Sequence, residues 1–153
     1  MSRAVTRDEM LSYPAGADMG TSRWIEIAQP RIDAFADVTE DWQFIHVDPE
    51  RAAQTAFGGT VAHGMLTLSM LSAMAYDALP AMTGQSASVN YGFDRVRFVA
   101  PVPAGARLRG RFTLAEATLR GRDKLMCRFG VSVEIEAQPR PALTADWLVL
   151  YVF

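Results

Sequence analysis

The chain has 153 residues, half of them hydrophobic, and a formal net charge of −2 at pH 7. This length fits one domain with a sizeable core, so we expect a single domain over residues 1–153. The slightly acidic balance provides no basic surface for nucleic acid, and we expect no such partner. A single cysteine, Cys127, excludes an intrachain disulfide and is typical of a reducing compartment.

The N-terminal segment carries charged residues and lacks the apolar stretch of a secretory signal. The longest run of low charge covers residues 61–76 and is shorter than the roughly 20 residues that a membrane-spanning helix needs. We therefore expect a soluble cytoplasmic protein that does not enter a membrane.

Breakers such as Pro14 and Gly16 divide residues 1–21, which we expect to form an N-terminal arm: a short helix or extended segment, then a loop. Alternation of side chains over residues 22–28 predicts a first strand. Helical spacing of apolar residues then predicts a helix over residues 29–39, with a proline suited to its first turn.

A loop is predicted over residues 40–47. Asp48 and Pro49 follow it as a suitable N-cap and first residue of a short helix. A second, longer helix is predicted from Gly64 to about Leu79, a length of about 24 Å. It carries no charge before its last turn, and a helix that is apolar on all sides is normally buried. The rest of the chain must then wrap around it.

The second half of the chain reads as successive strands separated by turns. The expected strands cover residues 89–99, 107–117, 125–137 and 143–153, with turns at residues 101–105 and 119–124. One buried helix followed by antiparallel strands indicates the α+β class.

An acid and an imidazole, Asp41 and His46, stand five residues apart in the predicted loop. Gly64 opens the predicted central helix, whose first N–H groups have no partners within the helix. An acid, a base and a helix N-terminus that meet could transfer protons on a carbonyl compound. Spacing alone leaves open that Asp41 is an unrelated surface acid and that Gly64 is an ordinary helix start.

Three segments carry a resemblance to a known family: Phe35-Ala-Asp-Val-Thr, Asp41-x-x-x-x-His46 and His63-Gly-Met-Leu. They resemble the (R)-specific enoyl-CoA hydratases of the MaoC-like family, which are hot-dog-fold enzymes. Gln43 and Phe44 stand where that family usually has Asn and Pro. These two residues and the segment Asn90–Arg97 are more similar to the NodN-like branch.

The resemblance implies a hot-dog fold, in which an antiparallel sheet wraps around a long central helix. It implies that Asp41 and His46 are the catalytic acid and base, and that Gly64 N–H forms the oxyanion hole. Ser72 would hydrogen-bond Asp41; otherwise it is a serine tolerated in a buried helix. By resemblance, Asn90 and Tyr91 line the substrate tunnel.

The departure at Gln43 and Phe44 has its own consequences. Without the family's proline, packing of Trp42, Phe44 or Ile45 into the core is expected to hold the loop. Gln43 and Phe44 are candidate residues of the acyl site. For His63 we favour a structural role, a hydrogen bond from its ring to a loop carbonyl.

The function implied is reversible hydration of trans-2-enoyl-CoA to (R)-3-hydroxyacyl-CoA by a homodimer. The expected partner is an acyl-CoA thioester, and neither a metal nor a separate cofactor is expected. Asp41, His46, His63 and Asp48 could together form a metal site, but their spacing along the chain matches no known pattern of metal ligands. Two alternatives stay open: an acyl-CoA thioesterase on the same fold, and a non-catalytic protein that binds acyl thioesters.

Overall fold

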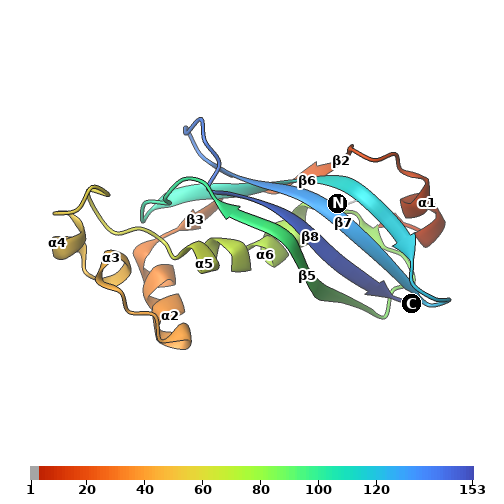
Figure 1. Cartoon of the computed structure of the whole chain (residues 1–153), viewed down its shortest axis with the longest axis horizontal. Helices are drawn as coiled ribbons and strands as arrows, with labels where there is room; N and C mark the ends of the chain where they lie inside the picture. The colour runs from red at the N-terminus through yellow and green to blue at the C-terminus, as the bar shows by residue number, and fades with distance from the viewer. Residues whose placement is uncertain (1–3) are drawn as a thin grey trace.

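An antiparallel sheet of six strands is the largest element of the computed structural model, which describes residues 4–153 (Figure 1). The strands are β2 (Ala17–Thr21), β3 (Ile25–Ile27), β5 (Ala87–Phe98), β6 (Ala106–Leu119), β7 (Lys124–Ile135) and β8 (Leu143–Val152). They run in the order β2-β6-β7-β8-β5, and β3 also pairs with β6. The α+β class is confirmed, and β5 forms one edge of the sheet.

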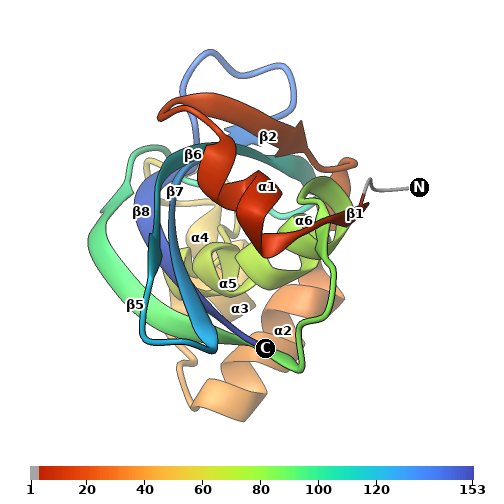
Figure 2. The same ribbon diagram turned by 90° about the vertical axis from the view of Figure 1, so that its right-hand side faces the viewer.

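The sheet curves around two short helices, as the end-on view shows (Figure 2). These helices are α5 (Gly64–Ser69) and α6 (Leu71–Ala78). Three further helices gather beyond the start of α5, namely α2 (Gln29–Thr39), α3 (Phe44–Val47) and α4 (Pro49–Ala52). At the opposite end lies α1 (Arg7–Ser12), near a parallel pair formed by β1 (Ala4–Val5) and β4 (Ala81–Met82).

The core fills the space between the concave face of the sheet and α6. Side chains of β7 and β8 alternate between this core and the outer face, as the period of a half-buried strand requires. Gly110 on β6 lies where the helix meets the sheet. A Cβ there would come within 3.1 Å of Met74 Cβ and 2.9 Å of a carbon of the Phe112 ring. The absence of a side chain at Gly110 therefore allows α6 to approach β6 closely.

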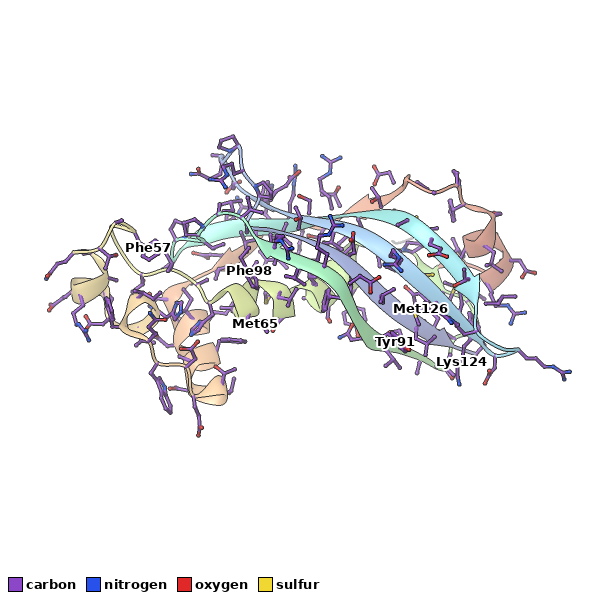
Figure 3. The ribbon with its side chains drawn as sticks, in the orientation of Figure 1. Phe57, Met65, Tyr91, Phe98, Lys124 and Met126 are labelled. Atoms are coloured by element: carbon purple, nitrogen blue, oxygen red, sulfur yellow. The ribbon has the colours of Figure 1, made fainter. Side chains whose placement is uncertain are left out.

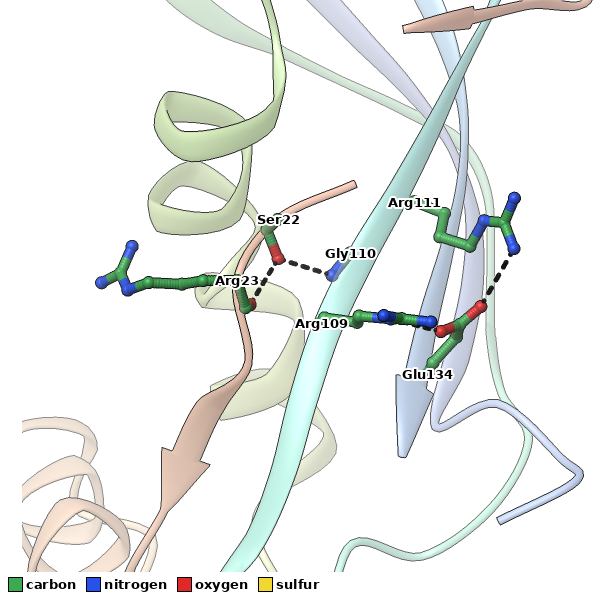
Figure 4. A network of polar contacts seen from close by, with 6 residues as sticks. All are labelled: Ser22, Arg23, Arg109, Gly110, Arg111 and Glu134. Atoms are coloured by element: carbon green, nitrogen blue, oxygen red, sulfur yellow. Dashed lines mark hydrogen bonds and ion pairs between the residues drawn. The ribbon is translucent and has the colours of Figure 1, made fainter. Parts of the chain in front are cut away.

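The outer face of the sheet carries a ladder of ion pairs (Figure 4). Glu134 accepts from Arg109 at 2.6 Å and from Arg111 at 3.4 Å. Beside them, the backbone N–H of Gly110 donates to the hydroxyl of Ser22, which ties the segment between β2 and β3 to β6. Exposed pairs of this kind contribute about 0–1 kcal/mol each, so the packed inner face dominates stability.

Several sequence predictions are confirmed. Helix α2 has the predicted bounds, with Pro30 in its first turn. Asp48 caps α4, because its carboxylate accepts from the backbone N–H of Arg51 at 3.1 Å. The four long strands begin and end within two residues of the predicted limits.

Two predicted loops were wrong. Residues 13–21 include strand β2, which pairs with β6 through a bulge at which Gly20 has φ +128°. Residues 40–47 include helix α3, whose turn is stabilised by a hydrogen bond from Val61 N–H to Ile45 O. Both segments are ordered by partners distant in sequence. The predicted arm begins with residues 1–3, which lie outside the described residues, and its predicted short helix is α1.

The predicted central helix is interrupted at Met70, which separates α5 from α6. The hydroxyl of Ser69 donates to Met65 O, a local bond that commonly distorts a helix. The first strand is also shorter than predicted, covering only β3. Burial of the helix on all sides was wrong for the single chain, because Met65 is 57% exposed and Tyr76 is 81% exposed. One face of the helix remains open.

Candidate active site

Asp41 lies immediately after α2, where the chain reverses direction. Glu40 ends the helix in the left-handed conformation, with φ 59°. The backbone N–H of Asp41 then donates to Ala36 O at 3.1 Å. This helix ending directs the chain back toward α3 and leaves the Asp41 side chain exposed.

His46 lies on α3 and is buried. Its Nδ1 is 2.6 Å from the carbonyl oxygen of Val61. Because a carbonyl can only accept, Nδ1 carries the hydrogen, and Nε2 of the neutral ring keeps its lone pair. The side chain of Gln29 donates to the backbone oxygen of His46 at 2.7 Å. Both the ring and the backbone of this residue are therefore held in place.

His63 completes the group from a third element, at the residue before α5. Its ring stacks on that of His46, with centroids 3.8 Å apart and an interplanar angle of 24°. Its Nε2 lies 3.0 Å from the backbone oxygen of Asp41, which confirms the predicted bond to a loop carbonyl. One nitrogen or carboxylate oxygen from each of Asp41, His46 and His63 lies within 4.8 Å of the others.

Within the part of the chain that the structure describes, Asp41, His46 and His63 also form a group of side chains that could hold a metal ion. Ring nitrogens bind a metal in the plane of the imidazole, at about 2.0–2.1 Å for zinc. In each of the stacked rings, one nitrogen already lies at a backbone carbonyl oxygen: His46 Nδ1 at Val61 O and His63 Nε2 at Asp41 O. One nitrogen of each ring is therefore already engaged in a hydrogen bond.

Gly64 begins α5 directly after His63. The first hydrogen bond of this turn runs from Thr67 N–H to His63 O, so the earlier N–H groups have no partners within the helix. The ring of Phe98, at the end of β5, covers the Cα of Gly64: an added Cβ would lie 2.9 Å from Phe98 Cδ1. Met65 and Phe98 mark this end of the helix and of β5 in Figure 3.

A row of cavities follows α5 and α6 on the side that faces β5 and β8. Gly64, Thr67 and Phe98 line the first cavity. The second and third share Ser72, Asn90 and Trp147, and the third has a volume of about 200 Å³. These cavities flank the two helices from the start of α5 to the end of α6, and we call this set of cavities the helix groove.

The structure brings some of the predicted substrate-binding residues to this groove. Asn90 donates to the hydroxyl of Ser72 at 3.4 Å, so the two predicted residues are neighbours. The predicted hydrogen bond between Ser72 and Asp41 is not formed among the described residues. Tyr91 lies at a bulge of β5, is 62% exposed, and lines a separate cavity together with Arg128.

Gln43 and Phe44 lie beside the catalytic candidates and outside the helix groove. The backbone N–H of Gln43 donates to a carboxylate oxygen of Asp41 at 3.4 Å. Arg51 lies over the Phe44 ring, 4.2 Å from its centroid. This contact supports α3 in place of the family's proline. Of the three residues expected to pack into the core, Trp42 is 55% exposed, whereas Phe44 and Ile45 are half-buried.

Sequence reasoning missed Thr67, Phe98 and Trp147 as residues of the groove. Their signals are weak, because apolar and hydroxyl side chains at such positions also occur in ordinary cores. The Thr67 hydroxyl and the Trp147 indole N–H are buried without a hydrogen-bond partner among the described residues.

Comparison with known proteins identifies the class. The MaoC like domain family matches residues 11–133, so the chain belongs to this family. Nodulation protein N of Rhizobium leguminosarum bv. viciae is 53% identical over 139 residues, covering 90% of this chain and 86% of that protein. The 3-hydroxyacyl-thioester dehydratase Z of Mycobacterium tuberculosis (strain ATCC 25618 / H37Rv) is 40% identical over 142 residues, covering 93% of each chain.

The fold agrees with this assignment. The (R)-hydratase from A. caviae involved in PHA biosynthesis superposes with a TM-score of 0.72 and 25% identity, over 90% of this chain and 96% of that chain. The predicted hot-dog fold is confirmed. The family contains hydratases and dehydratases, and the chain belongs to this general class of enzymes.

Among residues 4–153, no helix combines the length and the apolar character that crossing a bilayer requires.

Proposed function

We propose that this protein catalyses the reversible hydration of trans-2-enoyl-CoA to (R)-3-hydroxyacyl-CoA. The observation that carries the proposal is the meeting of Asp41 and His46, with side-chain atoms within 4.8 Å and the Nε2 lone pair of His46 left for proton transfer. Names of relatives support the same chemistry, because they include a 3-hydroxyacyl-thioester dehydratase and an (R)-hydratase.

The reaction adds water across the C2=C3 double bond. Asp41 or His46 accepts one proton from water as its oxygen bonds to C3, and the electrons of the double bond move toward the thioester oxygen. The resulting enolate is then protonated at C2. Two groups that exchange protons at neutral pH suit these two transfers, and general acid–base catalysis contributes about 10²–10⁴-fold in rate.

Gly64 N–H is proposed to stabilise the enolate oxygen. N–H groups at the start of a helix are oriented donors with a partial positive charge. The site needs no separate cofactor in this proposal, and no metal, because its own residues supply both proton transfers and the donor.

The helix groove is the proposed site of the acyl chain. It begins at Gly64, passes Ser72 and Asn90, and ends near the third cavity. Apolar side chains such as Leu79 and Val149 share its wall with the amide of Asn90. A groove that starts at the proposed oxyanion donor would place the thioester there and the alkyl chain along α6.

A homodimer is proposed because one edge of the sheet and one face of the central helices expose apolar side chains. The edge strand β5 exposes Val89, Tyr91 and Phe93, and the helix exposes Met65 and Tyr76. Pairing of β5 with its counterpart in a second copy would complete the backbone hydrogen bonds of this edge. It would also cover the open face of the helix groove. We propose that the dimer works in the cytoplasm.

A panel of trans-2-enoyl-CoA esters tests the function. Loss of the absorbance of the conjugated thioester reports hydration, and a thiol reagent reports release of CoA by hydrolysis. The proposal predicts loss of absorbance without free thiol. Release of thiol would favour a thioesterase, and no reaction with any ester, while binding persists, would favour a non-catalytic binding protein.

A further inference from the structure

His63 lies at the centre of the proposed active site and has no assigned role in the reaction. It is 2% exposed, and its ring is placed between that of Phe35, with centroids 4.9 Å apart, and that of His46, at 3.8 Å. A buried polar ring between two other rings is held in one orientation. Its nitrogens therefore point in fixed directions.

The hydrogen on the His63 ring can be assigned from its neighbours. Nε2 is 3.0 Å from the backbone oxygen of Asp41, which only accepts, so Nε2 is the donor. Nδ1 is buried with no partner among the described residues, and a hydrogen there would have no acceptor. His46 shows the opposite arrangement, with its hydrogen on Nδ1 toward Val61 O.

His63 is in this way joined to every proposed participant. Its Nε2–H holds the backbone of Asp41, its ring packs on the face of His46, and its backbone leads directly into Gly64. Asp41 and His46 belong to different elements, the end of α2 and the helix α3. The segment between them has an exposed Trp42 and no family proline to stiffen it. His63, on a third element, contacts both residues.

We propose that His63 is the positioning residue that holds Asp41 and His46 together beside the start of α5. This inference rests on the proposed hydration reaction. It acts through two separable contacts: the donor to Asp41 O and the ring against His46. The donor matters more for rate, because Asp41 follows the end of α2 and its side chain is exposed, held by a hydrogen bond from the backbone N–H of Gln43 at 3.4 Å. Small misplacements of a catalytic group cost as much as about 10²-fold in rate.

Two substitutions separate the contacts. His63→Phe keeps a ring and removes the donor, whereas His63→Gln keeps a donor near the place of Nε2 and removes the ring. We expect His63→Phe to lower kcat on trans-2-butenoyl-CoA by at least about 30-fold with KM changed less than about threefold. His63→Gln should retain kcat within about fivefold of the wild type. The core variant Val133→Ala, across the sheet, controls for loss of stability and should leave kcat unchanged.

Nitrogen-15 NMR gives a second readout that does not depend on activity. The chain has two histidines, so each His63 variant leaves the signals of His46 alone and assigns both rings. At about pH 8 the wild type should show one ring with its hydrogen on Nε2 (His63) and one with its hydrogen on Nδ1 (His46). If the wild type hydrates no enoyl-CoA, the proposed function fails, and the NMR result still decides the contact of His63.

The inference is overturned if His63→Phe retains kcat within threefold of the wild type, or if both His63 variants lose activity only in proportion to the fall in their melting temperatures. A wild-type spectrum in which His63 carries its hydrogen on Nδ1 would also overturn the inference. If neither His63 variant folds, His46→Gln assigns the spectrum instead, because it leaves the signals of His63 alone.

Discussion

The ring of Phe98 lies directly over the backbone of Gly64, so that an added Cβ would be 2.9 Å from Phe98 Cδ1. This contact joins the end of β5 to the start of α5, at the proposed oxyanion donor. Phe98 is 53% exposed, so the ring can move away from a new methyl group.

Gly64→Ala is therefore expected to fold, with the Phe98 ring displaced over the groove. The N–H remains, but the methyl group and the ring restrict the approach of the thioester, and kcat/KM should fall at least about tenfold. Loss of an oxyanion donor itself costs about 10²–10³-fold. Kinetics on trans-2-butenoyl-CoA measure the effect, and Phe98→Leu added to Gly64→Ala should recover part of it. Unchanged kcat/KM in Gly64→Ala would remove Gly64 from the proposed site.

The helix groove predicts the selectivity for acyl length. Ala75 lines the third cavity, near the end of α6. Ala75→Leu fills part of a volume of about 200 Å³ and should shorten the usable groove. We expect kcat/KM for trans-2-octenoyl-CoA to fall at least about tenfold relative to that for trans-2-butenoyl-CoA, since one methylene is worth about 10–200-fold in a hydrophobic pocket. An unchanged ratio in a well-folded variant would place the acyl chain elsewhere.

Helix α2 could be predicted from the sequence, whereas the turn of α3 could not, and the two cases differ in where the stabilising contacts lie. Helix α2 follows from local signals, the proline in its first turn and the helical spacing of Ile32 and Ala36, and its bounds were predicted. The turn of α3 depends on Val61 and Arg51, which lie beyond the segment, so a loop was the natural prediction. Local preference decided the first case, and tertiary contacts decided the second.

Side-chain partners were harder to predict than elements. The resemblance implied that Ser72 bonds Asp41, whereas Ser72 accepts from Asn90 on β5. A motif fixes positions along the chain, but the curvature of the sheet decides which strand faces the helix. The hydrogen bond of His63 to a loop carbonyl was predicted correctly in kind, because a buried imidazole beside a helix start has few other acceptors.

The edge strand predicts the oligomeric state. A dimer should sediment at twice 16.8 kDa. Lysine on a strand edge opposes pairing with another strand, so Val89→Lys should shift the protein toward the monomer. Val38→Lys is the matched control, because Val38 is 81% exposed on α2, away from β5. A wild-type monomer at micromolar concentration, or equal effects of the two substitutions, would contradict pairing through β5.

Burial raises the pKa of the Cys127 thiol to about 12 from an ordinary value of 9.0. The thiolate is the reactive form, so a thiol reagent at pH 8 should modify Cys127 only after unfolding. Because the folded state keeps the proton, stability should fall as pH rises above 9, by about 1.4 kcal/mol per pH unit at most from this group. Cys127→Ala should lose this part of the pH dependence. Rapid modification of the native protein would show that the strand β7 opens readily.

The most direct test of the account compares the wild type with Asp41→Asn and His46→Gln on trans-2-butenoyl-CoA. The rate of hydration is followed by absorbance, and the configuration of the 3-hydroxybutyryl product is determined by chiral chromatography. Each substitution removes a proton-transferring group and retains a similar shape, so we predict a folded protein with kcat lowered at least about a hundredfold. The wild type should form the (R) product. Near-normal hydration by either variant, or an (S) product from the wild type, would contradict the proposed mechanism.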